Sequence, residues 1–190
     1  MGWQAVGRSA RCRSVRAAEP DPLEILRVLE RHGVRYVLIG AAAARIAGAP
    51  VVTEVIDVTP ATDRSNLERL AAALLELDAR LRGPGDREGI SFLADAAILA
   101  TAEIWTLTTS AGDLDVCFTP SGTRGYNDLR REASRERLDE ELTVDVASLR
   151  DVIRSKEAAG RDKDLAQLPL LRRTLEQIRE RERETRGSDL

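Results

Sequence analysis

One short stretch constrains the fold more than any other part of the chain. Residues 35–39 contain the apolar run Tyr36–Ile39, which ends at Gly40, and residues 41–48 are rich in alanine. Residues 52–58 contain three valines and one isoleucine together with Asp57. A short apolar run bounded by a turn residue is typical of a buried strand, whereas alanine favours a helix. The stretch therefore predicts a strand, a glycine turn, a short helix and a second strand that carries a carboxylate.

The glycine turn predicts an anion site. Gly40 would let the backbone approach a ligand closely, and the first amides of the following helix have no partner inside that helix. Such amides bind phosphate groups. Asp57 on the next strand could then hold a divalent metal against the phosphate, because carboxylate oxygens are the ligands that Mg²⁺ prefers.

Strand alternation predicts which side chains share a face with this carboxylate. Side chains two residues apart point to the same side of a strand, so Thr53, Val55 and Asp57 are expected on one face. Asp113 and Asp115 on a later strand share a face by the same rule. The pattern leaves open which of the two accompanies Asp57, although the Asp-Leu-Asp register favours Asp115.

The remaining elements follow from periodicity and from cap residues. Asp21 followed by proline begins a helix, and Ser148 with Asp151 begins another. The predicted helices cover 22–32, 64–77, 126–133, 149–159 and a last one from 162, and further strands cover 104–108, 114–118 and 142–146. Residues 88–101 are ambiguous and readable as a short helix. Beyond Glu176 the alternating charges predict a solvated, fraying tail.

The length of 190 residues suits one domain. We expect a flexible basic tail at 1–20, a core at 21–147, C-terminal helices packed on that core at 148–184, and a tail at 185–190. The order of elements predicts an α+β fold with a mixed sheet flanked by helices. The net charge of −3 gives no overall nucleic-acid signal, so any RNA contact must come from local patches.

Composition indicates the cellular compartment of the protein and singles out two lysines. Cys12 and Cys117 fit no metal-binding spacing, and no apolar run reaches membrane-spanning length, so a reducing cytoplasm without membrane attachment is expected. Of the 29 basic residues only Lys156 and Lys163 are lysine. This bias indicates that ammonium chemistry is wanted at those two positions, against the alternative that they are two surface lysines by chance.

These motifs resemble the nucleotidyltransferase superfamily related to DNA polymerase β, in its minimal form. More narrowly, the chain is similar to the AbiEii-type toxin nucleotidyltransferases of bacterial toxin–antitoxin systems. Gly40, Asp57 and Asp115 match the family pattern. Two positions depart from it, because Ala41 stands where a second Gly or Ser is usual and Val55 stands where the first Asp of an Asp-x-Asp pair belongs.

The resemblance, which covers about residues 21–170, implies roles for particular residues. Those implied as catalytic are Asp57, Asp115, Lys156 and Asp164, and the metal ligands would be Asp57 and Asp115, with Asp113 as the alternative. The nucleotide would be held by Gly40, Ala41, Thr53 and Lys156. Mg²⁺ or Mn²⁺ is implied as cofactor and an NTP as substrate.

The function implied by the resemblance is transfer of nucleotides from an NTP to RNA, at the tRNA 3′ end, which blocks translation. A cognate antitoxin is the implied protein partner, and the oligomeric state stays open. Val55 predicts a weak or inactive chain, either as a degenerate member that binds nucleotide or a partner, or through an inactivating Asp-to-Val substitution. The second account is favoured because the motifs around position 55 are intact. A third possibility is modification of a small molecule, such as antibiotic adenylylation, by an enzyme of the same fold, although the sequence shows no distinct signal for such an acceptor. Candidate RNA contacts are Arg45, Arg124, Arg130 and Arg131.

Overall fold

The computed structural model describes residues 21–83, 85 and 88–188. The expected tail at 1–20, which includes Cys12, lies outside these residues, as do the last two residues of the tail expected at 185–190. Across the described ranges, no helix combines the length and the apolar character needed to cross a membrane.

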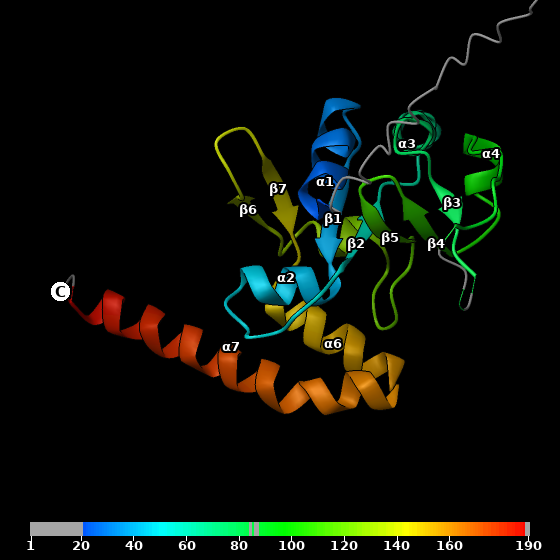
Figure 1. The fold of residues 1–190 in the computed structure, drawn as a ribbon. Helices are drawn as coiled ribbons and strands as arrows, with labels where there is room; N and C mark the ends of the chain where they lie inside the picture. Colours follow the sequence, from blue (N-terminus) through cyan, green and yellow to red (C-terminus); the bar gives the residue numbers. More distant parts are fainter. Residues whose placement is uncertain (1–20, 84, 86–87, 189–190) are drawn as a thin grey trace, which may run out of the picture.

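A seven-stranded mixed sheet forms the centre of the fold (Figure 1). The strands lie in the order β3-β4-β5-β2-β1-β7-β6. Their bounds are β1 Tyr36–Ile39, β2 Val55–Pro60, β3 Arg80–Leu81, β4 Ile104–Thr109, β5 Gly112–Cys117, β6 Ser134–Arg137 and β7 Thr143–Val146. Strand β2 runs parallel to β5 and antiparallel to β1, so the sheet is mixed. The α+β prediction is confirmed.

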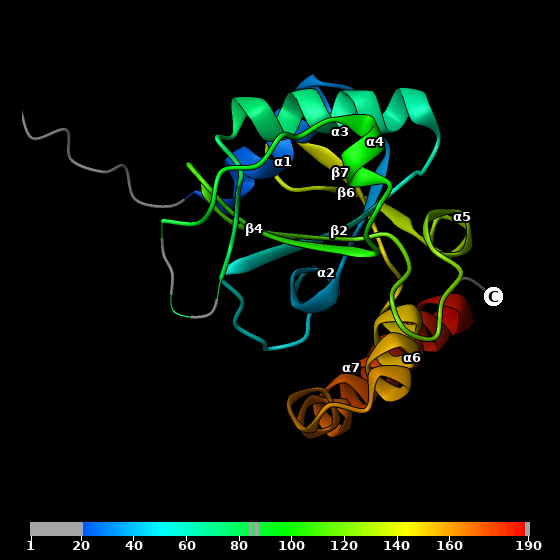
Figure 2. The same ribbon diagram turned by 90° about the vertical axis from the view of Figure 1, so that its right-hand side faces the viewer.

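Helices cover both faces of this sheet. They are α1 Pro22–Arg31, α2 Gly40–Ile46, α3 Arg64–Glu76, α4 Ala96–Leu99, α5 Tyr126–Leu129, α6 Leu149–Ala159 and α7 Asp162–Ser188. Figure 2 shows α1 and α3 on one side of the sheet, and α2, α6 and α7 on the other. The predicted caps are present, because the side chains of Asp21 and Ser148 accept from the backbone N–H of Leu23 and Asp151.

The main apolar core lies on the side of α1 and α3. Ile56 and Val58 of β2 and Leu114 and Val116 of β5 are buried, and α1 contacts both strands. Full burial of one such side chain contributes on the order of 1.5–3 kcal/mol. Because side chains alternate along a strand, burying these residues on one face sends Asp57 and its neighbours to the opposite face. The core thereby fixes where the polar site lies.

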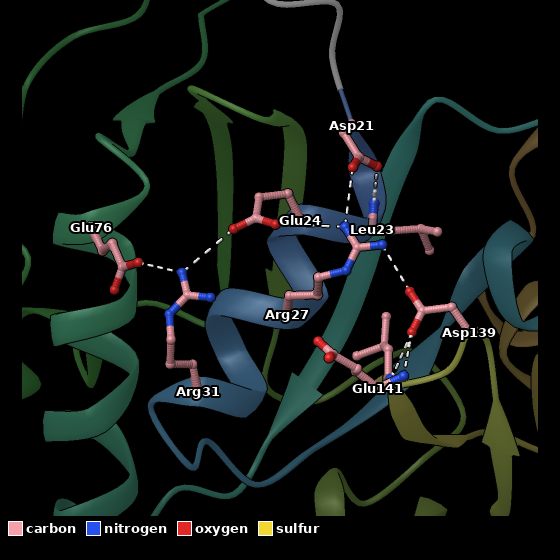
Figure 3. A network of polar contacts seen from close by, with 9 residues as sticks. Asp21, Leu23, Glu24, Arg27, Arg31, Glu76, Asp139 and Glu141 are labelled. Atoms are coloured by element: carbon pink, nitrogen blue, oxygen red, sulfur yellow. Dashed lines mark hydrogen bonds and ion pairs between the residues drawn. The ribbon is translucent and has the colours of Figure 1, made fainter.

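Ion pairs on the outer side of α1 connect this helix to distant parts of the chain (Figure 3). Arg27 Nη2 lies 2.8 Å from the carboxylate of Asp139, in the turn between β6 and β7. Arg31 pairs with Glu76 at the end of α3. Exposed pairs of this kind contribute about 0–1 kcal/mol each, so the network fixes orientation more than it stabilises.

The last helix is longer than predicted. Helix α7 continues through Ser188, and Figure 1 shows its C-terminal part extending past the sheet. The predicted fraying beyond Glu176 is therefore wrong for the described residues, whereas the predicted solvation agrees with the exposed residues 180–184. Arg and Glu are good helix formers, and their alternation places opposite charges three residues apart, where they stabilise a helix.

Two short edge strands were not predicted, and one helix was predicted too long. The helix expected at 126–133 ends after Leu129 and is followed by β6, whose residues Ser134–Arg137 carry charges and no apolar face. Strand β3 has only two residues. Short, charged edge strands lack the apolar alternation by which a strand is recognised. Within 88–101 only α4 is helical, and Phe92 stacks on Trp105 instead.

Candidate active site

Asp57 and Asp115 lie side by side on neighbouring strands. In the parallel pairing of β2 with β5, Asp57 is the partner of Asp115, and Val55 is the partner of Asp113. Neighbouring strands are about 4.8 Å apart, and partners on the same face point the same way. The four side chains therefore share one face. Of the two candidates for the later carboxylate, Asp115 is directly opposite Asp57, and Asp113 is opposite Val55.

Gly40 touches the Asp57 carboxylate. Gly40 has φ of +68°, and a Cβ built on it would lie 2.8 Å from Cγ of Asp57. The glycine is thus required both by its backbone conformation and by the room that the carboxylate needs. Helix α2 has seven residues and no side-chain cap, so its dipole contributes little. Phosphate binding at Gly40 and Ala41 stays a prediction.

The Gly40→Ala variant should lose stability through both effects. A side chain at positive φ costs about 1–2 kcal/mol, and overpacking against the carboxylate adds about 1–3 kcal/mol. Gly48→Ala is the matched control, because Gly48 has φ of +95° and nothing within 4 Å of its built Cβ. Urea unfolding of the three proteins measures the difference. Equal losses for both variants would show that the contact with Asp57 does not constrain position 40.

The C-terminal helices bring Lys156 and Asp164 into direct contact. Lys156 Nζ lies 2.8 Å from Oδ1 of Asp164, and Arg161 Nε lies 2.6 Å from its Oδ2. The Asp164 side chain is 4% exposed and that of Lys156 is 14% exposed. Burial alone would raise the pKa of Asp164, but hydrogen bonds from Lys156 and Arg161 outweigh it, and the pKa is lowered. This carboxylate is therefore held as an anion.

The charges of these helices act on the carboxylates of the sheet. Lys156, Lys163 and Arg161 each lower the pKa of Asp57, and Lys163 and Arg161 also lower that of Asp115. The only two lysines of the chain thus act on the same carboxylate. Arg161 and Lys163 were not among the predicted site residues, although the scarcity of lysine had marked position 163. The turn between α6 and α7 thus contributes cations whose charge favours the ionised form of these carboxylates.

Asp57 itself has a perturbed pKa. Burial raises the pKa of Asp57 from 3.8 to about 6, with the charge of Asp115 acting in the same direction and the nearby cations acting against it. Burial also raises the pKa of Asp115, which Arg82 counteracts. The ionised pair is therefore costly unless a positive charge balances it.

The raised pKa of Asp57 predicts a pH-dependent stability. Between the unfolded pKa of 3.8 and the folded pKa of about 6 the native state binds the extra proton, so the unfolding free energy falls as pH rises through this window. Relative to Asp57→Asn, the natural chain should lose about 2–3 kcal/mol between pH 4 and 7 without divalent ions. Urea unfolding at both pH values measures this. Parallel pH profiles for the two proteins would contradict it.

Arg82, which the sequence did not single out, bridges the two acidic residues of β5. One of its guanidinium nitrogens pairs with Asp113, and Nη2 lies 2.6 Å from Oδ1 of Asp115. Arg82 follows β3, and its backbone N–H donates to the carbonyl of Thr106 on β4 over 2.9 Å. The alternation of Arg80-Leu81-Arg82 is the only local signal for this edge strand.

Thr53 does not lie on the strand, so its predicted placement is wrong. Strand β2 begins at Val55, and the Thr53 hydroxyl donates to the carbonyl of Val55 over 2.9 Å. Thr53 therefore closes a turn before the strand, and alternation along β2 does not extend to it. The turn is local side-chain chemistry that competes with the extended conformation.

The carboxylates do not fit a divalent ion in this arrangement. Their oxygens are suitable donors for Mg²⁺ or Mn²⁺. However, no three Asp, Glu, His or Cys side chains among the described residues are grouped to hold a metal. Val55 supplies no oxygen, and Arg82 engages the two carboxylates of β5.

The fold is that of nucleotidyltransferases. The crystal structure of the lincosamide antibiotic adenylyltransferase LnuA with lincomycin bound aligns with a TM-score of 0.52 and 13% identity, over 79% of this chain and 93% of that one. A protein from Thermotoga maritima assigned as a nucleotidyltransferase aligns with a TM-score of 0.49 and 15% identity, over 77% and 87% of the two chains. No protein-family model and no curated protein matches the chain. At such identities the likeness is one of fold alone.

Proposed function

We propose that the site is built for nucleotidyl transfer from an NTP. The observation that carries this proposal is the register of Asp57 with Asp115, opposite a helical turn whose lysines and arginine act on them. Nucleotidyl transfer asks the protein mainly to position the phosphates and to balance developing charge. Lys156 and Lys163 would neutralise the triphosphate. The acidic strands would need a further oxygen donor, such as the carboxylate of Val55→Asp, before they could hold a divalent ion.

We propose RNA as the acceptor, in a toxin that modifies the tRNA 3′ end and is controlled by a cognate antitoxin. A hollow of about 360 Å³ supports a polyanionic acceptor, since Arg150, Arg179 and Arg183 line it together with Glu182. Arg150 and Lys156 lie six residues apart on α6, which is roughly 9 Å along the axis. The hollow is a better RNA candidate than Arg124 and Arg130, which are paired with Asp128 and Asp145.

A second candidate is modification of a small molecule. The alignment with LnuA favours it, because that protein acts on a lincosamide antibiotic and shares the fold. The arginine-lined hollow distinguishes the two proposals, since a neutral or cationic drug gains nothing from it. A chain that only binds nucleotide or a partner is the third possibility, and Val55 is the observation behind it.

The test is a transfer assay with labelled NTPs. The natural chain and its Val55→Asp variant are incubated with Mg²⁺ or Mn²⁺ and with tRNA, or with lincomycin. Label in tRNA, abolished by adding Asp57→Asn to the variant, is the expected result. Label in lincomycin alone would favour the second function, and no label in either acceptor, with intact NTP binding, would favour a binding protein.

A further inference from the structure

We propose that Arg82 is a resident cation of the acidic site, which competes with a divalent metal ion for Asp113 and Asp115. The guanidinium bridges the two carboxylates, with Nη2 at 2.6 Å from Asp115 Oδ1 and another nitrogen paired with Asp113. The inference concerns the site of the proposed function, but it depends on neither the NTP nor the acceptor.

The position of Arg82 in the fold supports a built contact. Its backbone is held on the sheet by the hydrogen bond to Thr106, and Thr106 is in turn the strand partner of Asp115. The Arg82 side chain is 20% exposed, and those of Asp113 and Asp115 are 36% and 28% exposed. A planar guanidinium can satisfy two carboxylates at once, which a lysine ammonium cannot do with the same geometry.

The neighbouring strand explains why a cation is needed there. Asp113 faces Val55 across the β2–β5 pair, and Asp115 faces Asp57. Three carboxylates on one face repel each other, and burial raises the cost. With a valine at position 55 the pair on β5 lacks a further oxygen ligand for a metal, and Arg82 balances its charge instead.

The competition predicts a gain of metal affinity when Arg82 is removed. Arg82→Gln should bind Mn²⁺ at least about tenfold more tightly than the natural chain, because a competitor and a like charge have both been removed. Mn²⁺ titration followed by electron paramagnetic resonance measures this without NTP or RNA. Absence of nucleotide transfer would therefore leave the result unaffected.

Arg80→Gln is the matched control. Arg80 lies two residues before Arg82, at the start of β3, and its Nε lies 3.5 Å from the carboxylate of Asp78. The Arg80→Gln variant should leave the Mn²⁺ affinity within about twofold of the natural chain, because the Arg80 side chain is 39% exposed and solvent and salt screen its charge. Combining Arg82→Gln with Asp115→Asn should abolish the gain.

Circular dichroism shows whether Arg82→Gln folds. If it does not, Arg82→Lys provides a second test of the proposal. It keeps the charge and loses the bridging geometry, so its Mn²⁺ affinity should lie between those of the natural chain and the glutamine variant. Unchanged or weaker binding by the folded Arg82 variants would overturn the proposal. An equal gain in Arg80→Gln would overturn it as well, since a general charge effect would then suffice.

Discussion

The Val55→Asp variant should transfer nucleotides about 10²–10³ times faster than the natural chain, which is the typical effect of one preorganised electrostatic group in an active site. Position 55 is the strand partner of Asp113 and lies on the face of Asp57 and Asp115. A carboxylate there would add the oxygen donor that the acidic face lacks. Initial rates of label transfer from NTP to tRNA, at saturating Mn²⁺, measure the change.

Stability should respond to the same substitution in the opposite direction. Like charges opposite each other on neighbouring strands are destabilising, so Val55→Asp should unfold more easily in EDTA and recover on addition of Mn²⁺. Val52→Asp is the control, because Val52 lies just before β2 and is 88% exposed. If Val55→Asp is no faster than the natural chain, or if Val52→Asp gains equally, position 55 is not the missing element of the site.

Among the substitutions of charged residues, removal of the Asp164 carboxylate should be the most destabilising. Asp164→Ala leaves Lys156 with its charge largely buried and without its partner. Breaking a buried pair from one side costs about 3–5 kcal/mol, and we expect the lower end because Arg161 stays well exposed. The midpoint of urea unfolding measures the loss.

Asp162→Ala provides the comparison within the same first turn of α7. Asp162 is exposed, so its removal should cost only the favourable interaction with the helix N-terminus, about 0.3–1 kcal/mol. Similar losses for both variants would mean that the Lys156–Asp164 pair does not hold α6 against α7. A larger loss for Asp164→Ala would show that this pair sets the position of the lysine that acts on Asp57.

The two predictions address two parts of the proposed site, which are the acidic strands and the turn between α6 and α7. Position 55 lies on β2 beside the acidic residues of the sheet, and Asp164 lies at the turn between α6 and α7, which supplies the cations. If both predictions hold, the missing carboxylate at position 55 limits the rate of transfer, and the turn between α6 and α7 is a stable part of the fold. Loss of nucleotide binding in Asp164→Ala, with the chain still folded, would link the two.

The sequence determined the elements whose signals are local. The strand–glycine–helix–strand unit, the helix caps at Asp21 and Ser148, and the facing of Asp113 with Asp115 all follow from periodicity or from a single side chain. The scarcity of lysine also marked two of the cations that lower the pKa of Asp57. These patterns need no knowledge of which segments become neighbours.

Only the tertiary structure decided which residues that are distant in the chain lie in contact. Strand order brought Asp57 opposite Asp115, and an edge strand of two residues placed Arg82 between the carboxylates of β5. The pairing of Lys156 with Asp164 likewise depends on the turn between two helices. Strand pairing and edge contacts join residues that are far apart in the chain, whereas a local sequence pattern does not specify which segment becomes its neighbour. The charge balance of the acidic residues could therefore not be predicted from the sequence alone.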